Sequence, residues 1–193
     1  MFLHSTYDGQ GFDDYRPEVH DSDGIYMKRG DGEEIWRPLN NPPALSNSYF
    51  DDDGPQAFGL LQRQRNFEGY QDASAHYESR PSVLVEPTGN WGKGTIRLVE
   101  LPSQKEYNDN IVALWRPAQP AKAGETLEFA YKLSWGNLEP DPNATLAFVS
   151  AMLMGHGGNA IDGPDPNLRK FVVEFRAGEL SALAGDAQST ALT

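Results

Sequence analysis

The apolar residues of this chain come in short runs, and their spacing constrains the fold more than any other feature. The runs are rich in β-branched and aromatic residues and end at Gly, Pro, Asn or Asp, a pattern typical of strands separated by turns. Alternation is clearest over 127–133, which predicts a half-buried strand there. The predicted strands are Gly24–Met27, Glu34–Arg37, Ala57–Gln62, Ser82–Glu86, Thr95–Leu101, Ile111–Trp115, Leu127–Trp135, Leu146–Leu153 and Phe171–Phe175.

These predicted strands follow one another at roughly ten-residue spacing, which favours an all-β sandwich or barrel. A short helical turn is predicted within Arg63–Tyr77. The segment 155–166 contains a Gly-Gly pair and two steps into proline, so we expect a loop or linker there.

Composition narrows the classes of function. The chain has 38% hydrophobic and 23% charged residues, as globular proteins do. A net charge of −12, with 16 Lys and Arg residues in no run, argues against a nucleic acid as partner. Without cysteine, neither a disulfide framework nor a zinc–thiolate site is expected. No window approaches the roughly 18 apolar residues of a membrane span, so no membrane insertion is expected.

Both ends of the chain look unfinished. One new strand is predicted at 171–175, and only the polar segment up to Thr193 follows it. Because a lone strand cannot bury its face, we expect this strand to open a second β domain. The sequence therefore predicts an internal piece of a longer protein.

Two clusters of carboxylates stand out. The first contains Asp21, within 16–24, and the second contains Asp109, just before the apolar run that begins at Ile111. A glycoside hydrolase needs at least two carboxyl groups, one to protonate the leaving oxygen and one to assist water. Here they would come from two distant segments of the chain. Two alternatives stay open: Asp21 and Asp23 can cap a turn that ends at Gly24, and Asp109 can lie in a solvated turn.

Other polar and aromatic residues divide between scaffold and site. His20 is expected to brace the first cluster by hydrogen bonding rather than to bind metal, since no histidine has ligand spacing around it. Arg16 and Arg37 read as ion-paired scaffolding. Tyr77 and Arg80 are candidate substrate contacts because they offer donors within a polar segment. Each tryptophan is either a sugar-stacking platform or, more often in a sandwich, a core residue; the four are Trp36, Trp91, Trp115 and Trp135.

Several motifs together resemble one family. The chain is similar to the periplasmic glucan biosynthesis proteins of the OpgG/MdoG and OpgD type, and the blocks occur in family order. The resemblance covers about 11–137, with a weaker match at FVVEFRAGEL (171–180). The blocks are RPEVHDSDG (16–24), IWRPLNNP (35–42), FGLLQR (58–63), FEGYQD (67–72), HYESRPS (76–82), VEPTGNWGKG (85–94), LVELP (98–102), NDNIVALW (108–115) and YKLSWGN (131–137).

The resemblance implies a fold and a domain organisation. Its members are expected to have a large antiparallel β-sandwich of galactose-mutarotase type, joined by a linker to a small immunoglobulin-like domain. Residues 1–154 would then be the C-terminal part of the glucan-binding sandwich, and residues 155–169 the linker. Residues 170–193 would be the first strand or strands of a truncated immunoglobulin-like domain.

The resemblance also implies a function. It points to a periplasmic protein acting on β-1,2-glucan, similar to inverting endo-β-1,2-glucanases and needing no cofactor or metal. In that reading Asp109 is the general acid, Asp21 is the general base and Glu106 is a supporting carboxylate. Substrate binding would involve Tyr77, Arg80 and Trp91. The alternative is a non-catalytic glucan-binding factor that assists a membrane glucosyltransferase.

Overall fold

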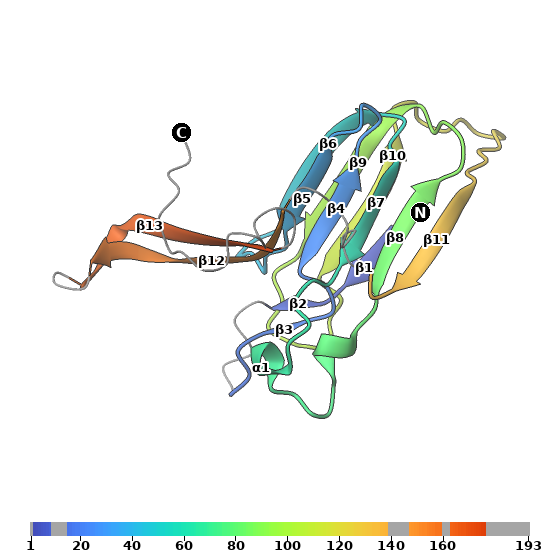
Figure 1. Cartoon of the computed structure of the whole chain (residues 1–193). Coiled ribbons are helices and arrows are strands. Elements are labelled where there is room, and N and C mark those ends of the chain that lie inside the picture. Colours follow the sequence, from blue (N-terminus) through green and yellow to red (C-terminus); the bar gives the residue numbers. More distant parts are fainter. Residues whose placement is uncertain (1, 9–14, 139–146, 160–162, 177–193) are drawn as a thin grey trace. The chain divides into compact units, whose positions relative to one another are not determined.

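The chain divides into two compact units, residues 1–138 and 139–193, which are described separately. The structure, a computed structural model, describes residues 2–8, 15–138, 147–159 and 163–176. Figure 1 shows the order of the elements along the chain. Among these residues, no helix is long and apolar enough to span a membrane.

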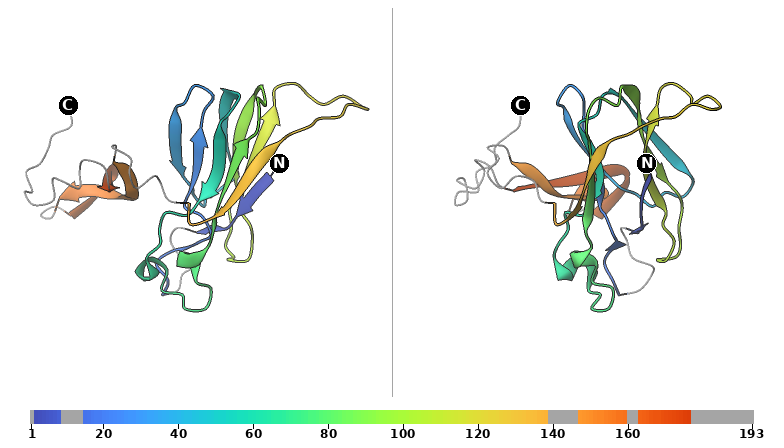
Figure 2. Two further views of the ribbon diagram at one scale, coloured as in Figure 1. Left: turned by 45° about the vertical axis from the view of Figure 1, so that its right-hand side comes forward. Right: turned by 90° about the vertical axis from the view of Figure 1, so that its right-hand side faces the viewer.

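The first unit is a sandwich of two antiparallel sheets, which confirms the predicted all-β sandwich class (Figure 2). The four-stranded sheet has the order β1 (Phe2–Ser5), β10 (Ile111–Pro117), β9 (Lys93–Glu100), β6 (Ser46–Asp53). The five-stranded sheet has the order β11 (Tyr131–Gly136), β8 (Ser82–Pro87), β7 (Ala57–Leu61), β4 (Gly24–Lys28), β5 (Glu34–Pro38). A separate short pair joins β2 (Tyr7–Asp8) to β3 (Val19–His20).

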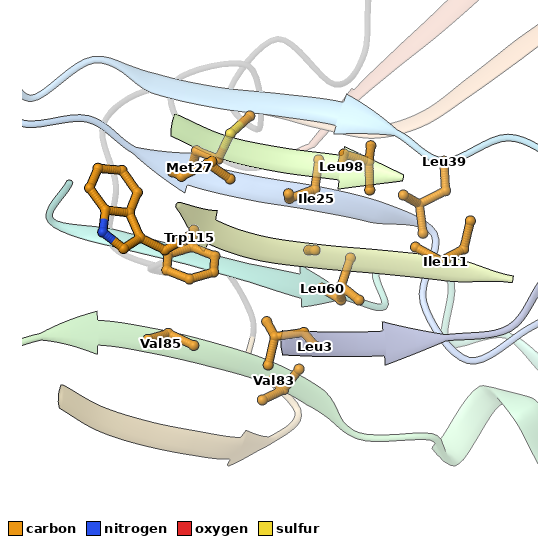
Figure 3. Close-up of a cluster of buried hydrophobic side chains, with 13 residues drawn as sticks. Leu3, Ile25, Met27, Leu39, Leu60, Val83, Val85, Leu98, Ile111 and Trp115 are labelled. Atoms are coloured by element: carbon orange, nitrogen blue, oxygen red, sulfur yellow. The ribbon is translucent and has the colours of Figure 1, made fainter. Parts of the chain in front are cut away.

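The core lies between the two sheets, where alternate residues of each strand face inward (Figure 3). Ile25 and Met27 of β4 are fully buried, as are Ile96 and Leu98 of β9. This is the period of two that a strand imposes on its side chains. Burying each such side chain contributes about 1.5–3 kcal/mol, so the inward faces stabilise the sandwich.

A buried ion pair also links the two sheets. Glu100, at the end of β9, is 1% exposed and accepts hydrogen bonds from Arg37 of β5 on both oxygens, at 2.5 and 2.6 Å. The backbone N–H of Asn40 donates to the same carboxylate at 2.7 Å. The expectation that Arg37 is ion-paired scaffolding is therefore confirmed.

Some strands differ from their predicted extents. The polar β6 was not predicted, because as an edge strand paired only with β9 it needs no continuous apolar run. Strand β11 begins at Tyr131 rather than Leu127, since its partner β8 ends opposite it at Pro87, which has no N–H for the ladder. The half-buried face predicted for 127–133 is wrong as well, because all seven residues are exposed.

The connection between β7 and β8 carries two short helical segments, as predicted within Arg63–Tyr77. Helix α1 spans Phe67–Tyr70, and the 3-10 turn η1 spans Tyr77–Ser79. Tyr70 and Tyr77 pack with Val19 in a small cluster of their own. This cluster anchors the connection against the short β2–β3 pair.

The second unit contains one long antiparallel hairpin, β12 (Phe148–Asn159) and β13 (Gly163–Arg176). The loop predicted over 155–166 is therefore wrong for 155–159 and 163–166, while 160–162 lie outside the described residues. Both strands of a two-stranded ladder are edge strands, and edge strands tolerate glycine and proline where the pairing is irregular. The pairing is irregular here, because the register shifts beside His156. The assignment of 155–169 to a linker and of 170–193 to a second domain stays a prediction.

Candidate functional site

A pocket of about 200 Å³ lies at the end of the sandwich where β4 and β8 begin and where β1, β7 and β11 end. It therefore collects residues from both sheets. Its polar lining is His4, Ser5, Asp21, Ser22 and Arg80. Its apolar lining is Leu60, Pro81, Val83 and Trp135.

Asp21 reaches this pocket from the turn between β3 and β4. Its backbone N–H donates to the Thr6 carbonyl oxygen at 3.0 Å, which fixes the turn against the chain after β1. Among the described residues no donor hydrogen-bonds Oδ1 of Asp21, and the Arg80 guanidinium lies 3.5 Å from that oxygen. Burial raises the pKa of Asp21, and the Asp109 charge raises it further, although Arg80 and His20 oppose the shift. A more basic carboxylate with an acceptor oxygen that lacks a donor is suited to activating water.

Asp109 lies at the same end of the sandwich, just before Asn110 and strand β10. Its Oδ2 lies 2.6 Å from Nδ1 of His4, and its Oδ1 accepts a 3.3 Å hydrogen bond from the Thr6 hydroxyl. Thr6 thus contacts Asp21 through its backbone and Asp109 through its side chain. The structure therefore brings together two acids that are 88 positions apart in the sequence (109 − 21).

Glu106 contacts neither Asp21 nor Asp109 in any described hydrogen bond or ion pair, and its partners are Arg16 and Tyr77. It accepts a 3.0 Å hydrogen bond from Arg16 and another from the Tyr77 hydroxyl. The Arg16 hydrogen bond holds the pKa of Glu106 below its ordinary value. Arg16 also donates to Asp72 at 2.8 Å, so it ties the β9–β10 connection to the β7–β8 connection. The expectation of Arg16 as ion-paired scaffolding is confirmed.

Tyr77 and Arg80 connect Glu106 to Asp21. Tyr77 is 3% exposed, and burial followed by its hydrogen bond to Glu106 raises its pKa. The Arg80 guanidinium lies 5.2 Å from the Tyr77 ring centroid on one side and approaches Asp21 on the other. Arg80 lines the pocket, whereas Tyr77 supports it from below the surface.

Trp91 does not join this site. It lies in the β8–β9 connection, at the opposite end of the sandwich, and packs against Phe58 and Trp115. Its indole N–H donates to the Ala130 carbonyl at 3.1 Å. The tryptophan at the pocket is Trp135, 64% exposed. The sequence analysis chose Trp91 rather than Trp135 as a substrate contact, and it singled out none of His4, Ser5 and Ser22.

His20 braces the site from the core, as predicted. It is 2% exposed, with Nδ1 2.8 Å from Oε1 of Gln62 and Nε2 3.2 Å from Oε2 of Glu18. Its neighbour Asp23 accepts the backbone N–H groups of Arg63 and Gln64 at 3.1 and 3.0 Å. Asp23 therefore holds the chain after β7 and does not cap the turn that ends at Gly24. In the parts of the chain that the structure describes, no three His, Cys, Asp or Glu side chains gather as metal ligands.

Comparison with known proteins identifies the family. The family profile described as "Periplasmic glucan biosynthesis protein, MdoG" matches residues 1–193. The chain belongs to this family. Within the MdoG family it is 52% identical over 193 residues to "Glucans biosynthesis protein G" of Cereibacter sphaeroides, covering 100% of this chain and 36% of that protein.

Two further MdoG-family relatives carry the same name. The protein from Shewanella sp. (strain MR-4) is 50% identical over 175 residues, which is 91% of this chain and 31% of the relative. The protein from Vibrio cholerae serotype O1 is 49% identical over 176 residues, again 91% of this chain and 32% of the relative. The chain thus spans about a third of the length of the curated relatives that it matches.

Proposed function

We propose that this chain carries the acid–base site of a periplasmic glucan biosynthesis protein that hydrolyses β-1,2-glucan with inversion. Asp109 is the general acid that protonates the leaving glycosidic oxygen. Asp21 is the general base that takes the proton from the attacking water. Glu106 takes no proton in this scheme; held by Arg16, it positions Tyr77 beneath Arg80.

The observation that carries the proposal is that Asp21 and Asp109 both hydrogen-bond Thr6. Asp21 lines the pocket, and Asp109 contacts the pocket residue His4. Inverting glycosidases need two carboxyl groups on opposite sides of the scissile bond, with room for a water between one of them and the sugar. The raised pKa of Asp21, and the absence of a donor to its Oδ1 among the described residues, support the base role. Family membership and the relatives' name support a glucan as the substrate and the periplasm as the compartment.

A second function, glucan binding without hydrolysis beside a membrane glucosyltransferase, is favoured by one contact. Both oxygens of Asp109 are engaged, Oδ2 by His4 and Oδ1 by Thr6. A carboxylate that accepts two hydrogen bonds has fewer positions from which to pass a proton to a ligand. A carboxylate has about four acceptor positions, so two remain to which sugar hydroxyl groups can donate.

The test measures turnover and affinity on the same Asp109→Asn protein. Because the chain spans about a third of its relatives, the assay uses a protein of full family length that contains these residues. With linear β-1,2-glucan, the α anomer should appear first in proton NMR of the new reducing ends. Asp109→Asn should lose roughly 10²–10⁴ in rate, with little change in calorimetric affinity, because the acid acts mainly in the transition state.

The matched control is Asp53→Asn, the same substitution on an exposed residue at the far end of β6. It should retain both turnover and affinity. Unchanged turnover in Asp109→Asn, or no hydrolysis by the unaltered protein, would refute the acid role. Affinity and rate that fall together would assign Asp109 to glucan binding, and a first-formed β anomer would refute inversion.

A further inference from the structure

Trp135 occupies an unusual position on the edge strand β11. It pairs with Val83 of β8, which is 7% exposed, and cross-strand partners share a face of the sheet. Trp135 therefore lies on the core-facing side of the five-stranded sheet. Among the described residues nothing covers it, since its exposed fraction is 64%.

The surroundings of Trp135 in the pocket are polar and charged. The pocket also receives His4 and Ser5 from β1 and Asp21 and Arg80 from the connections. Oδ1 of Asp21 is buried and faces the Arg80 guanidinium at 3.5 Å, but no donor hydrogen-bonds it in the described structure. A buried acceptor without a donor is costly, so a ligand hydroxyl or a water that donates to it would be stabilised there.

The combination of an exposed indole and a carboxylate oxygen without a donor selects a class of ligand. A pyranose ring has an apolar C–H face and a rim of hydroxyl groups, so one ring can pack on an indole while its rim bonds to acceptors and donors. The cavity of about 200 Å³ is smaller than the roughly 300–1,000 Å³ of sites that enclose a whole drug-sized ligand. Its size suits one ring of an extended chain.

The competing explanation is that another protein segment covers the exposed indole of Trp135. A strand laid over Trp135 would also remove Asp21, Arg80 and His4 from water. Burying those groups costs free energy unless every one of them finds a partner. A sugar ring supplies hydroxyl partners and leaves the pocket open to solvent between binding events.

We propose that Trp135 is the stacking platform for a glucose ring bound beside Asp21 and Arg80. This inference rests on the proposed function, because it takes the β-1,2-glucan as the ligand. It adds a binding residue to that site and replaces Trp91, which lies at the other end of the sandwich. The ring that stacks on Trp135 thereby lies within reach of the candidate base.

The experiment follows tryptophan fluorescence while linear β-1,2-glucan is mixed with the full-family-length protein by stopped flow, before hydrolysis consumes the probe. The variants are Trp135→Phe and Trp135→Ala. The matched control is Trp36→Phe, because Trp36 lies outside the pocket and is covered by the Arg63 guanidinium at 3.5 Å from its ring centroid. Acrylamide quenching without glucan reports whether Trp135 is open to solvent in the longer protein.

We expect a glucan-dependent fluorescence change in the unaltered protein and in Trp36→Phe that is absent in Trp135→Phe. Trp135→Ala should bind roughly 10- to 100-fold more weakly, and Trp135→Phe less so, because phenylalanine keeps a smaller stacking surface. The inference is overturned if Trp135→Phe keeps the full response, if Trp135→Ala binds normally, if the unaltered protein does not bind the glucan, or if acrylamide cannot reach Trp135.

These outcomes separate the platform from the hydrolase. Binding that depends on Trp135 without any release of reducing ends would overturn hydrolysis and support the platform. Hydrolysis with normal affinity in Trp135→Ala would support the hydrolase and overturn the platform.

Discussion

Replacing Arg37 by methionine should destabilise the sandwich strongly, because it leaves the Glu100 carboxylate buried without its cation. Glu100 is 1% exposed and receives both nitrogens of the guanidinium, so only the Asn40 N–H would remain as a donor. Breaking a buried pair by removing one partner costs about 3–5 kcal/mol. For a unit of this size, that corresponds to a fall in Tm of roughly 10–20 °C.

The measurement is urea unfolding followed by tryptophan fluorescence, with Tm from circular dichroism. The control is Lys132→Gln, which breaks the exposed Lys132–Glu86 pair at 2.9 Å and should cost only about 0–1 kcal/mol. The double variant Arg37→Met/Glu100→Met should recover most of the loss, because two apolar side chains no longer leave a buried charge. A loss below about 1 kcal/mol in Arg37→Met would refute the reasoning, since that is the value of a surface pair.

Two further predictions concern stability against pH and have opposite signs. The pKa of Asp21 is raised above its ordinary 3.8, so its stabilising contribution is present below that value and is lost as pH rises through the raised pKa. Asp21→Asn should therefore melt at a higher temperature than the unaltered protein at pH 7, with the gain vanishing near pH 3; an equal Tm at pH 7 would contradict this. The pKa of Glu106 is lowered from 4.5 by Arg16, so its contribution is present above that value and lost as pH falls. Arg16→Gln should reduce Tm more at pH 7 than at pH 3, and a loss independent of pH would show that Arg16 acts through packing alone.

The all-β class could be read from the sequence because a strand imposes a period of two on any residue that must be buried. Ile25 and Met27, or Ile96 and Leu98, alternate with residues of the outer face, and the structure buries them accordingly. Edge strands escape this rule. Strand β6 pairs with one strand only, as do β12 and β13. Such strands tolerate polar residues, glycine and proline, and these residues made their sequences resemble loops.

The residue types of the site could be read from the sequence, because the family motifs contain Asp21 and Asp109. Which side chains meet depends on the packing of the two sheets. Asp21, in the turn after β3, and Asp109, two residues before β10, both hydrogen-bond Thr6, a residue with no sequence signal of its own. The same holds for the tryptophans, because Trp91 and Trp135 look alike in the sequence. The β8–β9 connection packs Trp91 against the core at one end of the sandwich, whereas strand pairing places Trp135, exposed, in the pocket. Contacts between segments about a hundred residues apart depend on how two sheets pack, and local periodicity carries no information about that.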